Sequence, residues 1–184
     1  MAWQKKAVTV WATGQECADV GGWDSVEIAL SLLLLLTANG APIIACYLLR
    51  GRGSWRVDAG LVFFDYEPLL GEAKTWRGIA AAVMCCMVIA LLLGYPAVLG
   101  VQFAVYAMLG DLISSFIKRR LHITVSDRAT GLDQIPEALL PLVMLQHELA
   151  LGPSEIAAAV IGFFFLELGL SRLLYHWHIR KRPY

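Results

Sequence analysis

The sequence predicts an all-α protein, a polytopic transmembrane bundle of about five helices. The 184-residue chain is 58% hydrophobic and 16% charged, with a mean hydropathy of +0.63. Soluble domains are nearer ~45–50% apolar and ~25% charged. The apolar residues are also concentrated in blocks, such as Val26–Leu36, Ile79–Leu93 and Ile156–Leu170. These blocks leave room for a single membrane domain over residues 1–184 and for no separate soluble domain.

Five apolar segments are candidates to cross the membrane, which takes ~20 residues of helix. Two tight turns, Gly94–Pro96 and Gly152–Ser154, and two long connections, residues 50–77 and 118–134, separate them. The fourth segment is short and carries Gln146–Glu148 near its end. The predicted spans are Val26–Leu49, Gly78–Gly94, Ala97–Ile117, Ile135–Leu151 and Glu155–Trp177.

Positive charge predicts the orientation of these spans. Twelve of the 15 Lys and Arg residues lie in the two long connections and the C-terminal tail. The positive-inside rule places those segments in the cytoplasm, so with five spans the N-terminus and residues 1–25 lie outside the cell membrane. Lys5 and Lys6 are followed by a short, mixed stretch with acidic residues, which does not resemble a cleavable signal peptide. The functional face is therefore expected on the cytoplasmic side.

Several function classes lack support in the sequence. The 15 acidic and 15 basic residues balance, which excludes capture of nucleic acid by the chain as a whole. The four cysteines form no CxxC pair, and Cys46, Cys85 and Cys86, which lie in apolar runs, are predicted to pack as small apolar residues. There is no HExxH zinc motif, P-loop, dinucleotide fingerprint or hydrolase elbow. The DGxxAR pattern of enzymes that transfer a phospho-alcohol from a CDP-lipid is also missing.

Two polar breaks in the apolar pattern fall at a similar membrane depth. Asn39–Pro42 interrupts the first span, and Asp111 lies in the third. At about 1.5 Å per residue, Asn39 lies about 20 Å and Asp111 about 21 Å from the outer start of its helix. Because polar groups are costly in hydrocarbon, we expect a shared polar pocket. The alternative for the first span is a simple proline kink, with Asn39 bonded to a neighbouring helix.

The spacing of four polar residues places them on a single helical face. Asp111, Ser114, Ser115 and Lys118 follow an i, i+3, i+4, i+7 pattern. A carboxylate, two hydroxyls and an ammonium group on one face suit an anionic substrate held beside a metal. The alternative is an aspartate paired within the bundle, with Lys118 extending to the membrane surface.

The second long connection ends at a predicted helix N-terminus. Pro136 fits the first turn of that helix, so Asp133 and Gln134 lie at its start, where backbone N–H groups accept anions. Asp133 is either a plain cap or, opposite Asp111, a second oxygen ligand for a divalent cation. Mg²⁺ favours one or two carboxylates together with substrate phosphates and water.

Three other charged residues have open roles. Lys74 and Arg77 directly precede the second span, where they are either topology anchors or clamps for a phosphate. Glu167 lies in the middle of the fifth span and is expected to make a structural contact between helices rather than to act as a catalyst.

Four segments in this order resemble the CDP-archaeol synthase family, which is similar in turn to phosphatidate cytidylyltransferases. The resemblance runs from about Asn39 to Pro141. The chain departs from the family pattern at Glu72-Ala73, ahead of Lys74, and over Val125–Thr130. The segments that carry the resemblance are Ala38–Pro42, Leu70–Gly78, Leu109–Arg120 and Gly131–Gln134.

The resemblance implies transfer of CMP from CTP to a lipid phosphate, with Mg²⁺, in a bundle of five helices whose active site faces the cytoplasm. On this hypothesis Asp111 and Asp133 hold Mg²⁺, while Lys118 and Arg119 bind the triphosphate. The remaining residues expected to bind substrate are Asn39, Lys74, Arg77, Ser115 and Gln134. Lys74 and Arg77 are assigned to the lipid phosphate, and Asn39 to a phosphate or the base.

Two alternatives stay open at the level of sequence. The same reaction could use a diacyl phosphatidate in place of an archaeol-type glycerol phosphate. A non-enzymatic membrane scaffold or transporter subunit would also explain buried polar residues, although not their gathering at the cytoplasmic end. Homo-oligomer formation is left open as well.

Overall fold

The computed structural model describes residues 24–49, 53, 55–71, 73–122 and 133–176. Over these residues the chain forms five α-helices and no strand, with two isolated β-bridges in the first long connection. This confirms the predicted all-α class. The helices are α2 (Asp24–Leu48), α3 (Trp76–Leu92), α4 (Ala97–Arg120), α5 (Gln134–Met144) and α6 (Pro153–His176). The expectations for residues 1–23, Glu72 and Val125–Thr130 lie outside the described residues.

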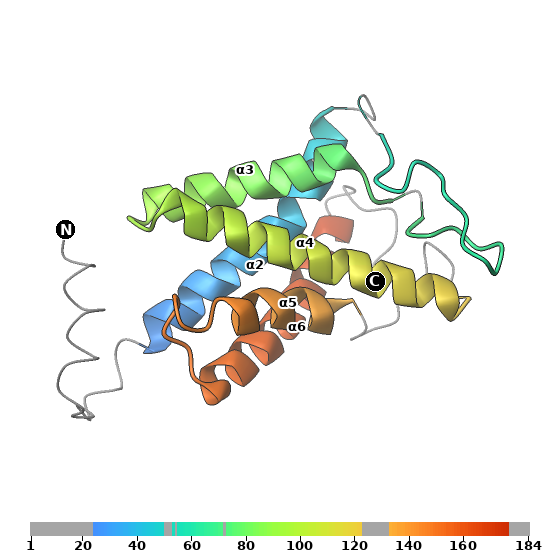
Figure 1. Cartoon of the computed structure of the whole chain (residues 1–184). Helices are drawn as coiled ribbons and strands as arrows, with labels where there is room; N and C mark the ends of the chain where they lie inside the picture. Colours follow the sequence, from blue (N-terminus) through green and yellow to red (C-terminus); the bar gives the residue numbers. More distant parts are fainter. Residues whose placement is uncertain (1–23, 50–52, 54, 72, 123–132, 177–184) are drawn as a thin grey trace.

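Successive helices run in opposite directions along the bundle (Figure 1). Each packs against the next, α2 also contacts α4, and α6 returns to pack against α2. One end of the bundle carries residues 55–71 and 73–75, the end of α4 and the start of α5. We call this the loop end. The tight turns after α3 and before α6 lie at the opposite end.

The helices approach closely because small residues line their contacts. A Cβ atom added to Gly100 would lie 2.4 Å from the carbonyl oxygen of Cys86, and one added to Gly110 would lie 2.3 Å from that of Pro136. Backbones in such contact are typical of helix packing in membranes, where small residues line the interfaces. The α4–α3 and α4–α5 interfaces therefore depend on the absence of a side chain at two positions.

Three helices are long and apolar enough to cross a membrane: Val26–Leu48, Ala97–Arg120 and Pro153–Leu170. The shorter apolar helices are α3, with 17 residues, and α5, with 11. The expected fourth span reached Leu151, and this is wrong for the helix, which ends at Met144. Residues 145–150 form hydrogen-bonded turns, and Ala150 adopts a left-handed conformation with φ of 51°.

The structure corrects two further boundaries. α4 continues to Arg120, so Lys118 and Arg119 lie on a helix rather than at the start of a loop. The expected interruption of the first span at Asn39–Pro42 is wrong, because α2 is helical from Asp24 to Leu48 with Pro42 inside it. Pro42 instead packs at the start of α3, where its Cβ lies 3.3 Å from the position of a Cβ on Gly78.

The first long connection is folded around a buried carboxylate. Asp58 is only 5% exposed, and its side chain accepts hydrogen bonds from the backbone amides of Gly60, Leu70 and Gly71. Further along, Val57 donates to the carbonyl of Lys74 and Trp76 to that of Trp55. Asp58 thus joins the two arms of the connection and fixes the chain that leads to Lys74.

Acid is expected to loosen this connection through Asp58. Burial alone would raise the pKa of Asp58, but the three backbone amides and the charge of Arg56 outweigh it and lower the pKa below its ordinary value. The stabilisation is therefore present above the pKa of the unfolded chain, ~3.9, and is lost as pH falls through the lower folded value. We expect the amides of Leu70 and Gly71 to exchange hydrogen faster across this step, and Asp58→Asn to remove the step.

Candidate functional site

Lys74 and Asp111 form the centre of the polar cluster at the loop end. The Lys74 ammonium lies 2.5 Å from both carboxylate oxygens of Asp111, although the residues are 37 positions apart. Lys74 is held at the end of the first long connection, where Thr75 caps α3 by accepting from the amide of Gly78. Asp111 is held on α4 directly after Gly110, which touches α5. Both side chains remain partly exposed, so incoming ligands can reach them.

A second ion pair joins α4 to the start of α5. The Lys118 ammonium donates to the carboxylate of Asp133, the residue before the first turn of α5. Asp133 makes no capping hydrogen bond to its own helix. The Asp133 carboxylate therefore binds the Lys118 ammonium rather than the backbone amides at the start of α5. This contradicts the alternative in which Asp133 is only a helix cap.

The predicted face of α4 points inward. Ser114 and Ser115 are buried, and the Ser114 hydroxyl donates to the backbone carbonyl of Asp111 at 2.9 Å. Arg119 is buried as well, and its Nε has no hydrogen-bond partner among the described residues. Gln134, at the start of α5, is almost fully buried. The loop end thus presents hydroxyl, amide and guanidinium groups beside the two ion pairs.

Glu137 is the acidic residue that sequence reasoning missed. It is 4% exposed, and its Oε1 atom has no hydrogen-bond partner in the described part of the chain. The Glu137 carboxylate is influenced by the charges of four residues, namely Asp111, Lys74, Glu167 and Asp133. A signal was present, because Glu137 lies four residues after Asp133 and therefore on the same helical face. It was read only as part of the helix start.

The other predicted residues lie on three different helices. Asn39 lies on α2, partly buried, and its amide nitrogen has no hydrogen-bond partner among the described residues. Arg77 is half-buried in the first turn of α3. Glu167 lies on α6, where its charge reaches Glu137. The expected structural contact of Glu167 between helices stays a prediction.

The donor set suits a hard cation, although it does not form a complete protein cage. No group of three or more His, Cys, Asp and Glu residues in the described ranges could hold a metal ion. Mg²⁺ needs only one or two carboxylates when substrate phosphates and water complete its shell. Asp111 and Asp133 would supply these oxygens, and the buried Oε1 of Glu137 has no hydrogen-bond partner among the described residues. The residues fit such an ion with the substrate present.

Comparisons with known proteins agree on one family. The CDP-archaeol synthase family model matches residues 26–184. The CDP-archaeol synthase of Hyperthermus butylicus is 40% identical over 118 residues, which span 60% of this chain and 66% of that protein. The enzyme of the same name from Sulfurisphaera tokodaii is 30% identical over 164 residues, 84% of this chain and 93% of its own length.

The fold has a match among solved structures. A structure described as an intramembrane enzyme for archaeal membrane lipid biosynthesis aligns with a TM-score of 0.63 and 31% sequence identity. The alignment covers 77% of this chain and 90% of the other. The shared fold and the shared sequence therefore extend over most of the chain rather than over one motif.

Proposed function

The chain belongs to the CDP-archaeol synthase family, and we propose that it transfers CMP from CTP to an archaeol-type glycerol phosphate in the membrane. The products are the CDP-lipid and pyrophosphate. The observation that carries this proposal is the pair of Lys–Asp contacts at the loop end, where two cations and two carboxylates meet beside an apolar bundle. This arrangement suits two phosphate-bearing substrates, one of them a lipid.

The two ion pairs suggest how the site accommodates a highly charged nucleotide. Lys74 neutralises Asp111, and Lys118 neutralises Asp133. When the two substrates bind, Lys118 would exchange its carboxylate for the triphosphate and Lys74 for the lipid phosphate, and the freed carboxylates would hold Mg²⁺. The ion, when bound, supplies positive charge beside the phosphates. Lys118 and Arg119 are assigned to the triphosphate, and Lys74 and Arg77 to the lipid phosphate.

The reaction depends mainly on how the protein positions its two substrates. A lipid phosphate oxygen attacks the α-phosphorus of CTP, the new P–O bond forms, and the bond to the bridging oxygen breaks to release pyrophosphate. Little covalent work falls to the protein, so alignment and charge neutralisation dominate. Ser115 lies one helical turn after Asp111, and Gln134 directly follows Asp133. Together with Asn39, they are proposed to orient phosphate or base.

We also propose the sidedness of the site. Lys118, Arg119 and Arg120 form a basic last turn on α4, and Lys74 and Arg77 lie at the same end of the bundle. This concentration supports a cytoplasmic loop end and C-terminus, with the N-terminus outside. CTP and Mg²⁺ are both available in that compartment.

The test is an assay of purified protein with radiolabelled CTP. An unsaturated archaeol-type glycerol phosphate and a diacyl phosphatidate are offered in parallel, each with Mg²⁺ and with a chelator. We expect label in the isoprenoid CDP-lipid, dependent on Mg²⁺. Label only in the diacyl product would keep the reaction and change the acceptor. Folded protein that neither binds CTP nor makes product would favour the scaffold alternative.

A further inference from the structure

The first long connection carries an apolar tip that nothing in the described chain covers. Phe64 is 94% exposed and Tyr66 is 92% exposed, and Leu61 and Val62 are also exposed. We call residues 61–66 the loop tip. The tip is nonetheless ordered, because Val62 pairs with Pro68 in a β-bridge and Phe63 donates to the carbonyl of Glu67. An ordered turn that exposes two aromatic side chains in this way indicates an interaction site.

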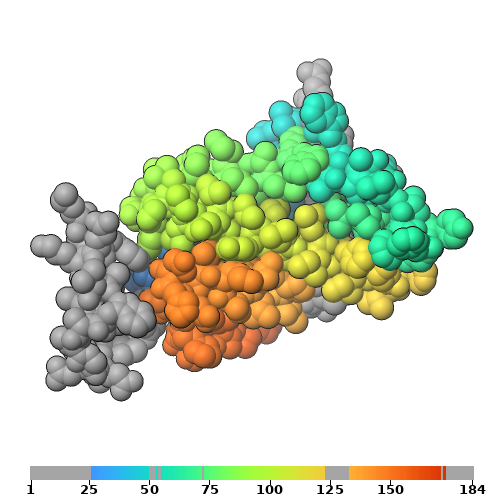
Figure 2. All heavy atoms as spheres, viewed as in Figure 1, coloured from blue at the N-terminus to red at the C-terminus, as the bar shows by residue number. Residues whose placement is uncertain are grey.

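The tip is fixed against the end of α4. Arg120 pairs with Asp65 at 2.5 Å, donates to the carbonyl of Pro68 at 2.9 Å and lies over the ring of Phe63. Phe63 in turn makes an edge contact with Phe116. Figure 2 shows residues 55–71 gathered in teal against the yellow end of α4.

This attachment sets the depth of the tip. α4 has 24 residues, about 36 Å at 1.5 Å per residue, and the hydrocarbon core is about 30 Å thick. Its last turn therefore lies in the head-group region, as the basic triplet there also indicates. Aromatic side chains concentrate at this depth in membrane proteins. Trp55 and Trp76, both exposed, lie at the base of the same connection.

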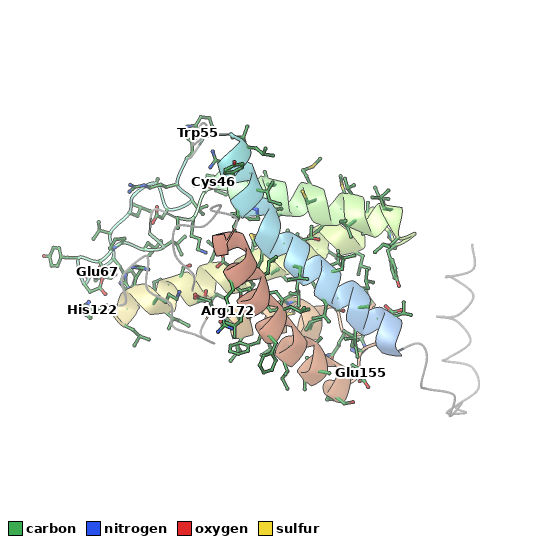
Figure 3. The ribbon with its side chains drawn as sticks, turned by 180° about the vertical axis from the view of Figure 1, so that it is seen from behind. Cys46, Trp55, Glu67, His122, Glu155 and Arg172 are labelled. Carbon is green, nitrogen blue, oxygen red and sulfur yellow. The ribbon has the colours of Figure 1, made fainter. Side chains whose placement is uncertain are left out.

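The carboxylates at the tip lie beside basic side chains. Asp65 pairs with Arg120, and Glu67, which follows the tip, lies 3.5 Å from His122 (Figure 3). Both carboxylates are partly exposed, but Phe64 and Tyr66, each more than nine-tenths exposed, dominate the surface of the tip. We propose that the loop tip inserts into the head-group region of the bilayer that the helices span.

Insertion would act on the lipid substrate through Lys74. Asp58 joins the inner part of the connection to Leu70 and Gly71, and the amide of Lys74 donates to the carbonyl of Gly71 at 3.5 Å. A tip anchored in the lipid thus holds Lys74 at a constant depth. This consequence rests on the proposed function, whereas the insertion itself does not.

Insertion is tested with Phe64→Trp in phosphatidylcholine nanodiscs, with wild-type emission subtracted. Lipids brominated near the head group should quench the added emission, and aqueous iodide should not. Quenching by iodide alone would overturn the proposal. Loss of a dimer in Phe64→Ser/Tyr66→Ser, without lipid quenching of the added tryptophan, would also overturn it and would identify a second copy as the partner.

The kinetic consequence is tested with the Phe64→Ser/Tyr66→Ser variant. Its KM for the lipid phosphate should rise about tenfold. A change of this size is expected when the bilayer no longer buries about half of one aromatic side chain. The Kd for CTP should stay unchanged. Leu92→Ser is the matched control, because Leu92 is 77% exposed at the opposite end of the bundle. An unchanged KM with lipid quenching intact would remove the link to Lys74. Wild-type protein without activity would instead refute the proposed function.

Discussion

Asp111→Asn is expected to lower kcat/KM on the order of 10²- to 10³-fold, a typical loss when one stabilising electrostatic group is removed. Asparagine keeps the shape of the side chain but removes its charge. The proposed Mg²⁺ site then loses a carboxylate, and Lys74 loses the partner that it contacts through both oxygens. The measurement is CDP-lipid formation in nanodiscs, with CTP binding followed in parallel.

The matched control is Glu155→Gln, which removes a carboxylate at the opposite end of the bundle. Its turnover should stay near that of the wild type. Near-normal turnover of Asp111→Asn would refute the metal assignment, because the variant lacks one of the two carboxylates proposed to hold Mg²⁺. A folded Asp111→Asn variant that still binds CTP but turns over slowly would support it.

Gly110→Ala is expected to disrupt both stability and activity. The added methyl group would lie 2.3 Å from the carbonyl oxygen of Pro136 and 2.7 Å from the Cα of Glu137. Both are backbone atoms, so α5 has to move away from α4. Overpacking of this kind costs about 1–3 kcal/mol. Asp133 directly precedes α5 and would move with it. A displacement of Asp133 by about 1 Å is expected to lower the rate about 10²-fold.

Gly169→Ala provides the comparison, since nothing lies within 4 Å of an added Cβ on that helical residue. Alanine is the better helix former, so this variant should be neutral or slightly more stable. Thermal unfolding in detergent and CDP-lipid formation measure the two effects. If Gly110→Ala unfolds at the wild-type temperature with full activity, the α4–α5 contact is not required.

The long spans were predictable because apolar length determines them. α2, α4 and α6 lie close to their expected ranges, as a bilayer demands ~20 apolar residues from each crossing helix. α5 was less predictable. The predicted span continued to Leu151, but Leu145 already departs from helical geometry, with φ of −109° and ψ of 18°. Pro42 led to the opposite error. The sequence predicted an interruption of the helix there, but α2 continues through Pro42.

The sequence predicted which residues belong to the candidate site better than it predicted which of them contact each other. Helical periodicity placed Asp111, Ser114 and Lys118 on one face, and the structure buries Ser114 while Asp111 and Lys118 stay partly exposed. Periodicity cannot choose partners across connections, so the contact of Lys74 with Asp111 was not foreseen. The loop that brings Lys74 there depends on Asp58, whose role arises from three backbone amides rather than from a side-chain motif.

The shortness of α5 also affects the lipid around the protein. Its 11 residues span about 17 Å, and Ile135, Leu139 and Val143 are exposed along one side. A helix shorter than the hydrocarbon core makes the neighbouring bilayer thin or its head groups dip. Head groups that sink beside α5 come closer to Asp133, at the start of the same helix. The mismatch would thus reduce the vertical distance that a lipid phosphate must travel to reach the charged cluster.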